Sequence, residues 1–138
     1  MKTLNELRDE IHDNAVKHGF YDNVKDGCYN TSVRVLEHAF FAQQIALIHS
    51  ELSEALEADR EEKYPTKEGL SIITNPVKVE EWKSLFERTI KNTVPDELAD
   101  VIIRTIDLCG YLGIDIEKHV ELKMRYNELR EYKHGKNY

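Results

Sequence analysis

One helix-like stretch, residues 93–112, constrains the fold most strongly. Thr93 suits the N-cap, and Pro95 and Asp96 suit a first turn, where a missing N–H costs nothing and negative charge meets the positive helix end. Four charged side chains fall within a stripe of roughly 80° on a helical wheel: Glu97, Asp100, Arg104 and Asp107. The rest is almost entirely apolar, as is typical of a buried helix. Because unpaired buried charge is costly, this stripe needs a metal ion or a basic partner.

The remainder of the chain also predicts helices. With 138 residues it is long enough for one compact domain, residues 1–138, and its three prolines and six glycines favour long helices over a turn-rich β fold. Hydrophobic spacing predicts helices at residues 3–18, 32–62, 78–91 and from 115 to about 130. The fold class is therefore all-α.

Local signals mark several helix ends. Thr3 and Glu6 form a capping-box pattern, and Asp115 suits the N-cap of the last helix. Gly19 ends the first helix, and Gly113 suits a left-handed cap. A break near residues 37–40 is an open alternative for the long helix. Residues 71–76 are expected to form a short loop or a strand-like segment, and residues 131–138 a basic tail.

Charge and cysteine content exclude several classes of protein. The chain is 33% charged with a net charge of −7, which argues against general nucleic-acid binding. No apolar run is long enough for a membrane span, and no signal-peptide pattern is present. Cys28 and Cys109 form no paired motif and are expected to be reduced thiols. These features predict a cytoplasmic location.

Two acidic pairs are the candidate metal ligands. Glu51 and Glu54 are three residues apart on the long helix, and Glu97 and Asp100 are three apart on the helix at 93–112, so each pair shares one helix face. A single pair of this kind is common on solvated helices. Two pairs, each at the edge of an apolar arc, predict two adjacent helices with four converging carboxylates. Oxygen ligands suit a hard cation, Mg²⁺ or Mn²⁺.

The last helix supplies basic residues on one face. Lys123, Asn127 and Arg130 recur at helical spacing, and Lys133 follows in the tail. One interpretation is ordinary surface charge near a helix C-terminus, where the helix dipole favours cations. The other is a polyphosphate-binding face beside the metal site.

Several other chemistries lack their motifs. The sequence has no Gly-rich phosphate loop before a Lys-Ser/Thr pair and no nucleophile elbow. Its one Glu-x-x-His, at Glu131 and His134, lies in the tail, whereas a di-iron bundle needs two such motifs inside it.

Together the acidic motifs resemble those of a known family. Glu51-Leu-Ser-Glu54 and Asp96-Glu-Leu-Ala-Asp100 resemble the Glu-Glu-x-x-Glu … Glu-x-x-Asp signature of the MazG-type nucleotide pyrophosphohydrolases, of the all-α NTP pyrophosphatase superfamily. The resemblance continues through residues 107–115, 123–130 and 133–136, and it covers residues 38–136. One position departs from the signature, since Ser50 stands where the first motif has a Glu.

The resemblance implies a four-helix-bundle-type fold that assembles as a homodimer or homotetramer. It implies Mg²⁺-dependent hydrolysis of nucleoside triphosphates to the monophosphate and pyrophosphate. Carried over, the metal ligands are Glu51, Glu54, Glu97 and Asp100, with Glu54 and Glu97 also catalytic and Glu54 the expected general base. The expected phosphate contacts are Lys123, Asn127, Arg130 and Lys133.

Alternatives remain open at this point. The substrate can be narrower, dUTP or dCTP, and the candidate base contacts are Phe20, Tyr21, His38 and Gln44. Packing on the core is the alternative role for Phe20 and Tyr21. Ser50 leaves open a catalytically inactive helical module that binds a nucleotide or a protein.

Overall fold

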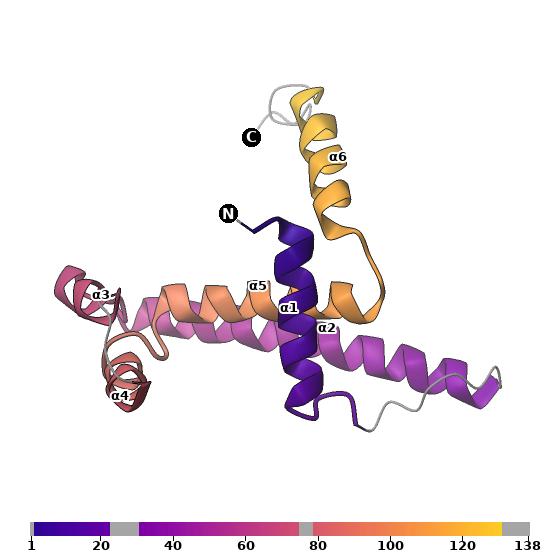
Figure 1. Ribbon diagram of the computed structural model, residues 1–138. Coiled ribbons are helices and arrows are strands. Elements are labelled where there is room, and N and C mark those ends of the chain that lie inside the picture. The colour runs from indigo at the N-terminus through magenta and orange to yellow at the C-terminus, as the bar shows by residue number, and fades with distance from the viewer. Residues whose placement is uncertain (1, 23–30, 75–78, 131–138) are drawn as a thin grey trace. The chain divides into compact units, whose positions relative to one another are not determined.

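The described residues, 2–22, 31–74 and 79–130 of a computed structural model, form six α-helices and no strand, which confirms the all-α prediction (Figure 1). The helices are α1 (Leu4–Lys17), α2 (Thr31–Arg60), α3 (Lys67–Thr74), α4 (Val79–Thr89), α5 (Val94–Tyr111) and α6 (Ile116–Glu128). None of the helices in these ranges has both the length and the apolar character that crossing a membrane requires.

The chain divides into two compact units. The terminal unit comprises Met1–Lys25 and Ile106–Tyr138, and the central unit comprises Asp26–Thr105. The division falls inside α5, so this helix contributes its first turns to the central unit and its last turns to the terminal unit. The prediction of a single domain over residues 1–138 remains a prediction.

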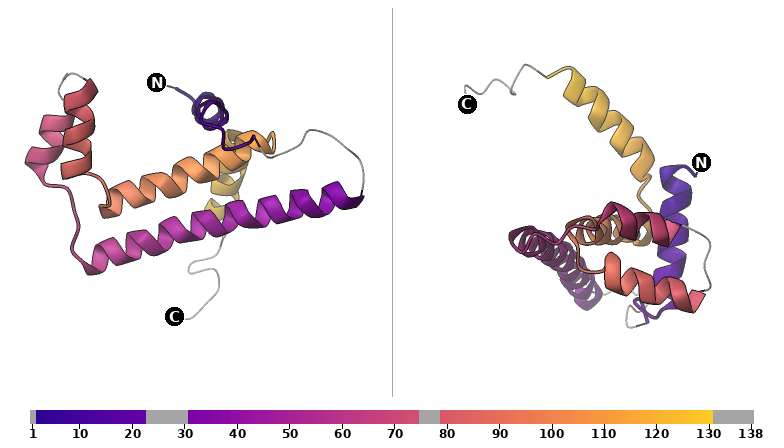
Figure 2. Two further views of the ribbon diagram at one scale, coloured as in Figure 1. Left: turned by 90° about the horizontal axis from the view of Figure 1, so that it is seen from below. Right: turned by 90° about the vertical axis from the view of Figure 1, so that its left-hand side faces the viewer.

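In the central unit, α2 and the first turns of α5 run side by side in opposite directions, with α3 and α4 between them in sequence (Figures 1 and 2). The end of α2 is a Schellman motif: the Lys63 N–H donates to the Ala58 carbonyl at 2.9 Å, and Glu62 takes the left-handed conformation at φ 55°. The Val94 N–H then donates to the Lys63 carbonyl at 3.0 Å. The C-terminus of α2 is thereby attached directly to the N-terminus of α5.

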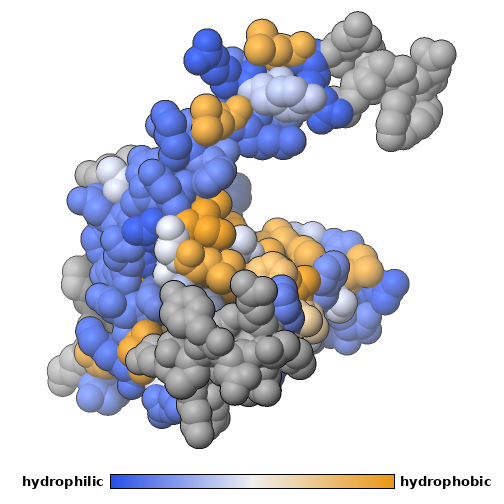
Figure 3. Space-filling model, turned by 90° about the vertical axis from the view of Figure 1, so that its right-hand side faces the viewer, coloured by the Kyte–Doolittle hydropathy of each residue, from blue (hydrophilic) through white to orange (hydrophobic). Residues whose placement is uncertain are grey.

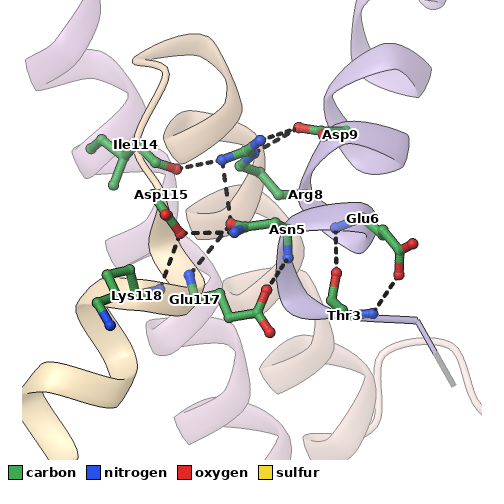
Figure 4. Close-up of polar contacts among 9 residues, drawn as sticks. All are labelled: Thr3, Asn5, Glu6, Arg8, Asp9, Ile114, Asp115, Glu117 and Lys118. Carbon is green, nitrogen blue, oxygen red and sulfur yellow. Dashed lines mark hydrogen bonds and ion pairs between the residues drawn. The ribbon is translucent and has the colours of Figure 1, made fainter.

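In the terminal unit, polar contacts join the start of α1 to the start of α6 (Figure 4). The Asn5 side-chain amide donates to Asp115 Oδ1 at 2.7 Å, and Arg8 Nη1 donates to the Ile114 carbonyl at 2.8 Å. Asp115 also accepts the Lys118 N–H and so caps α6. One carboxylate therefore both begins a helix and holds a second helix against it.

Most of the predicted helix ends are confirmed. Thr3 and Glu6 make both hydrogen bonds of the capping box, and Asp115 is the N-cap of α6. Gly19 and Gly113 have φ values of 78° and 64°, which the left-handed position after a helix requires. Helix α2 passes without a break through residues 37–40.

Three expectations about local structure and burial were wrong. Residues 71–74 belong to α3 rather than to a loop or strand, and the Thr66 hydroxyl caps this helix by accepting the Gly69 N–H at 3.0 Å; residues 75 and 76 lie outside the described ranges. Thr93 precedes α5 but its buried hydroxyl has no hydrogen-bond partner, while Asp96 accepts the Asn92 N–H at 2.9 Å. Helix α5 is also not buried all round, because three of its apolar side chains are exposed: Leu98, Ile102 and Ile103.

Candidate metal centre

Two helices of the central unit bring three carboxylates together. Helix α2 presents Glu51 and Glu54 one turn apart, and the first turn of α5 presents Glu97. One oxygen from each of these three side chains lies within 4.8 Å of the other two. These three residues are called the carboxylate cluster below. The sequence predicted the local spacing, and the structure supplies the approach of one pair to the other.

The cluster combines buried and exposed carboxylates. Glu51 and Glu97 are only 7% and 5% exposed, whereas Glu54 is exposed. Ala55 and Ala58 are buried beside them on α2. Small side chains on this face of α2 leave the carboxylates beside them unobstructed. The site is thus open to water on the Glu54 side.

The electrostatics of the cluster favour an added cation. Burial, followed by the charges of Glu54, Asp96, Glu51 and Asp100, raises the pKa of Glu97 above its ordinary value. Burial and the charges of Asp96 and Glu51 likewise raise the pKa of Asp100, although Arg104 acts in the opposite direction. Raised carboxyl pKa values mean that negative charge here is incompletely compensated. Asp100, the fourth predicted ligand, is affected by the charges of the same acids but does not belong to the three-oxygen cluster.

The cluster has few donors of its own. Arg104 Nε donates to Glu51 Oε1 at 2.6 Å, and the Ser50 hydroxyl donates to Glu54 Oε1 at 3.2 Å. The Glu97 carboxylate accepts no hydrogen bond from the described part of the chain. Since a carboxylate has about four acceptor positions, most of the cluster's capacity is left for a ligand.

The donor set fits a hard divalent cation. Mg²⁺ takes oxygen ligands at about 2.1 Å in an octahedron, so adjacent ligand oxygens are about 3.0 Å apart and opposite ones about 4.2 Å. The three oxygens of the cluster, which lie within 4.8 Å of one another, are close to this spacing. Three carboxylates without a sulfur or imidazole ligand suit Mg²⁺ or Mn²⁺ better than softer metals.

The predicted phosphate-binding residues belong to the terminal unit. Lys123 and Asn127 are exposed on α6, and Arg130 is exposed just beyond it. The centroid of the Tyr126 ring is 5.1 Å from Lys123 Nζ and 5.9 Å from Arg130 Cζ. We did not predict from the sequence that Tyr126 belongs to the basic face. Its spacing of three and four residues from the two cations would have indicated it. Lys133 lies outside the described residues, and the role of this face remains a prediction.

The candidate base-contact residues have different surroundings. Phe20 and His38 are exposed, and Gln44 is half-buried. Tyr21 packs inside the terminal unit, where its ring stacks on Tyr111 with centroids 5.1 Å apart. The packing interpretation of Tyr21 therefore has direct structural support.

Asp107 is a structural residue that the sequence did not reveal. It accepts hydrogen bonds from the Tyr21 hydroxyl at 2.7 Å and from His12 Nδ1 at 2.9 Å. Burial, followed by the hydrogen bond to Asp107, raises the pKa of Tyr21. Asp107 stood out as part of the acidic stripe, but its partners are 86 and 95 residues away in the chain. No spacing rule connects residues so far apart.

Comparison with known proteins gave no relative: no protein-family model, no curated protein and no solved structure matches the chain.

Proposed function

We propose that the protein is a Mg²⁺-dependent nucleoside triphosphate pyrophosphohydrolase that produces the nucleoside monophosphate and pyrophosphate. The observation that carries the proposal is the carboxylate cluster, with three oxygens from two helices within 4.8 Å and two of its members buried. The motif resemblance to the MazG-type family supplies the reaction class. Mg²⁺ usually shares its shell with substrate phosphates, which suits a site that is open on one side.

Each acid has a distinct role in this proposal. Glu51 and Glu97, which are buried, hold the metal, and Asp100 supports the same field from the next turn of α5. Mg²⁺ held by these residues would supply the positive charge that offsets the negative charge developing on the phosphoryl oxygens. Glu54 is exposed, so it reaches water as well as the cluster and accepts the proton of the attacking water. Lys123, Asn127 and Arg130, the expected phosphate contacts, belong to the terminal unit, and their role stays a prediction.

The test is pyrophosphate release from a panel of ribo- and deoxynucleoside triphosphates, with Mg²⁺ and with a chelator. We expect pyrophosphate and monophosphate only with the metal, and the panel ranks the bases, dUTP and dCTP included. Orthophosphate with diphosphate would show that another bond is cut. If no nucleotide released pyrophosphate or orthophosphate, the proposed enzymatic activity would be rejected.

Two contacts favour a second candidate, a catalytically inactive helical binding module. Arg104 already engages Glu51, and Ser50, which replaces the motif's first Glu, already engages Glu54. Such a module has little affinity for Mg²⁺. A working site is stabilised by about 2.7 kcal/mol at a metal concentration 100 times Kd. Thermal unfolding with and without Mg²⁺ therefore separates the two candidates.

We also propose that the protein assembles as a homodimer or homotetramer. Exposed hydrophobic residues interrupt the hydrophilic surface in the face drawn in Figure 3. On the helices that carry the acids, Leu52 and Leu56 form an exposed pair on α2, and Leu98 and Ile102 form one on α5. Each pair is spaced four residues apart and so forms an apolar strip beside the acids. Analytical ultracentrifugation tests the assembly, and a monomer at all concentrations would reject it.

A further inference from the structure

Arg104 is the cation in direct contact with the carboxylate cluster. Its Nε lies 2.6 Å from Glu51 Oε1, across the space between α5 and α2. The Glu51 side chain is 9% exposed, whereas that of Arg104 is 36% exposed. The arginine therefore reaches from a water-accessible position to a carboxylate that is almost closed to water.

The ion pair occupies one of the proposed metal ligands. Glu51 Oε1 accepts the hydrogen bond from Arg104 Nε, so the guanidinium competes with a metal for this carboxylate. In the structure it thus supplies part of the positive charge that a metal would supply.

A guanidinium released from Glu51 has a second use. It carries five N–H donors in a fixed fork, a geometry that matches phosphate oxygens. Arg104 follows Asp100 by one helical turn, and its partial exposure lets an anion approach. An anionic substrate that arrives with the metal therefore meets both a metal and a free arginine.

We propose that Arg104 is an exchangeable counter-ion of the site: it neutralises Glu51 in the metal-free protein and moves to a substrate phosphate when the metal takes Glu51. This inference rests on the proposed function. The exchange makes binding of metal and of phosphate mutually reinforcing, since each removes the competitor of the other. Such coupling typically changes the affinity for one ligand by roughly 5- to 150-fold when the other is bound.

The test is calorimetric binding of Mn²⁺ alone, of pyrophosphate alone, and of pyrophosphate with saturating Mn²⁺. For Arg104→Gln we expect Mn²⁺ to bind roughly 10-fold more tightly than in the wild type, because its competitor for Glu51 is gone. We expect the gain in pyrophosphate affinity on adding Mn²⁺ to fall in the same variant. Arg60→Gln is the matched control: it removes one positive charge from the same helical unit, but Arg60 pairs with exposed Glu57.

A second variant keeps the test informative if Arg104→Gln does not fold. Arg104→Lys retains the charge beside Glu51 but lacks the fork. We expect it to bind Mn²⁺ as the wild type does and to lose most of the metal-dependent gain in pyrophosphate affinity. Circular dichroism confirms that each variant is folded.

The outcomes separate this proposal from the proposed function. Weaker Mn²⁺ binding by Arg104→Gln would mean that Arg104 only positions Glu51, and unchanged binding would mean that it does not compete; either result overturns the exchange alone. Absence of Mn²⁺ binding by the wild type and both variants overturns the metal site and the exchange together. If Mn²⁺ and pyrophosphate bind to the wild type and the variants as expected but no nucleotide is hydrolysed, the proposed enzymatic activity is rejected and the exchange is still supported.

Discussion

The two units of the chain differ in the groups that surround their carboxylates. In the terminal unit, each oxygen of Asp107 has a donor, the His12 ring for Oδ1 and the Tyr21 hydroxyl for Oδ2. In the central unit, burial, followed by the charges of the neighbouring acids, raises the pKa of Glu97. Asp107 is half-buried and Glu97 is buried, and the two also differ in the donors that the chain supplies.

This contrast separates a structural acid from a candidate ligand. A carboxylate whose donors come from its own chain stabilises the fold, because the hydrogen bonds offset the cost of desolvation. A carboxylate buried without donors costs stability until something positive binds. Perturbed acids of the second kind concentrate at functional sites. Asp107 therefore belongs to the framework, whereas the carboxylate cluster is the candidate site.

The largest effect is expected from Glu97→Gln on turnover. Loss of a buried metal ligand should reduce Mg²⁺-dependent pyrophosphate release by more than roughly 100-fold, since even residues that only orient metal ligands typically contribute 10- to 100-fold. Glu57→Gln is the control, because Glu57 is on α2 but is exposed and paired with Arg60. Activity near that of the wild type in Glu97→Gln would remove the basis of the four-carboxylate site.

The complementary experiment in the terminal unit is Asp107→Ala, which should lower the stability of the fold. Two donors, from His12 and Tyr21, lose their acceptor, and each unsatisfied group costs about 1–3 kcal/mol. We expect the free energy of unfolding to fall by roughly 2–4 kcal/mol in urea denaturation. Asp13→Ala, an exposed acid on α1, is the control. Equal stability of the two variants would mean that Asp107 is not a framework residue.

Gly110→Ala tests the approach that brings His12 to Asp107. A Cβ on Gly110 would lie 2.6 Å from the His12 Cβ, so α1 must shift away from α5. We expect a loss of roughly 1–2 kcal/mol, after the gain in helix propensity is counted. Near-UV circular dichroism should also change, because Tyr21 and Tyr111 stack beside this contact. An unchanged spectrum and stability would show that the helices tolerate the added methyl group.

A smaller effect of opposite sign is expected for Glu97→Gln in the absence of metal. Removing one of several neighbouring negative charges should raise the free energy of unfolding by up to about 1 kcal/mol. The same substitution should abolish the stabilisation by Mg²⁺. Thermal unfolding in a chelator and in Mg²⁺ measures both. A metal-free variant that is less stable than the wild type would show that Glu97 is structurally satisfied.

The smallest effect concerns pH, and its sign differs between the units. The hydrogen bond from Asn5, followed by the Lys118 N–H, lowers the pKa of Asp115, so its stabilisation is present above the ordinary Asp pKa and is lost as pH falls through the folded value. The pKa of Glu97 is raised, so its destabilisation is relieved as pH falls through the folded value.

Urea midpoints measured from neutral pH to about pH 3 check these signs. Asp115→Asn should make the loss of stability on acidification shallower, and Glu97→Gln should make it steeper. If the urea midpoints of the two variants changed with pH in the same way, the proposed difference between the carboxylates of the two units would be contradicted.

The sequence predicted what is decided locally. The capping box at Thr3, the cap at Asp115 and the left-handed Gly113 each involve residues within one helical turn, so spacing alone identifies them. The acid pairs were likewise visible as residues three apart. Helix α3 was missed although Thr66 offered an N-cap signal, because its segment is short and a proline follows it.

What the sequence could not predict depends on contacts between distant segments. Arg104 belonged to the acidic stripe, but its pairing with Glu51 joins residues 53 positions apart. Tertiary packing thus selected this pair among charged side chains that were locally equivalent.

The hydrogen bond from the Val94 N–H to the Lys63 carbonyl has a consequence for how such a chain can evolve. It fixes the register of the two acid-bearing helices at the point where the chain leaves one and enters the other. The intervening residues, with α3 and α4, form an insert whose ends are already joined. Each doubling of a flexible insert costs only about 0.6 kcal/mol. This stretch can therefore be lengthened, shortened or exchanged while the acids stay in place.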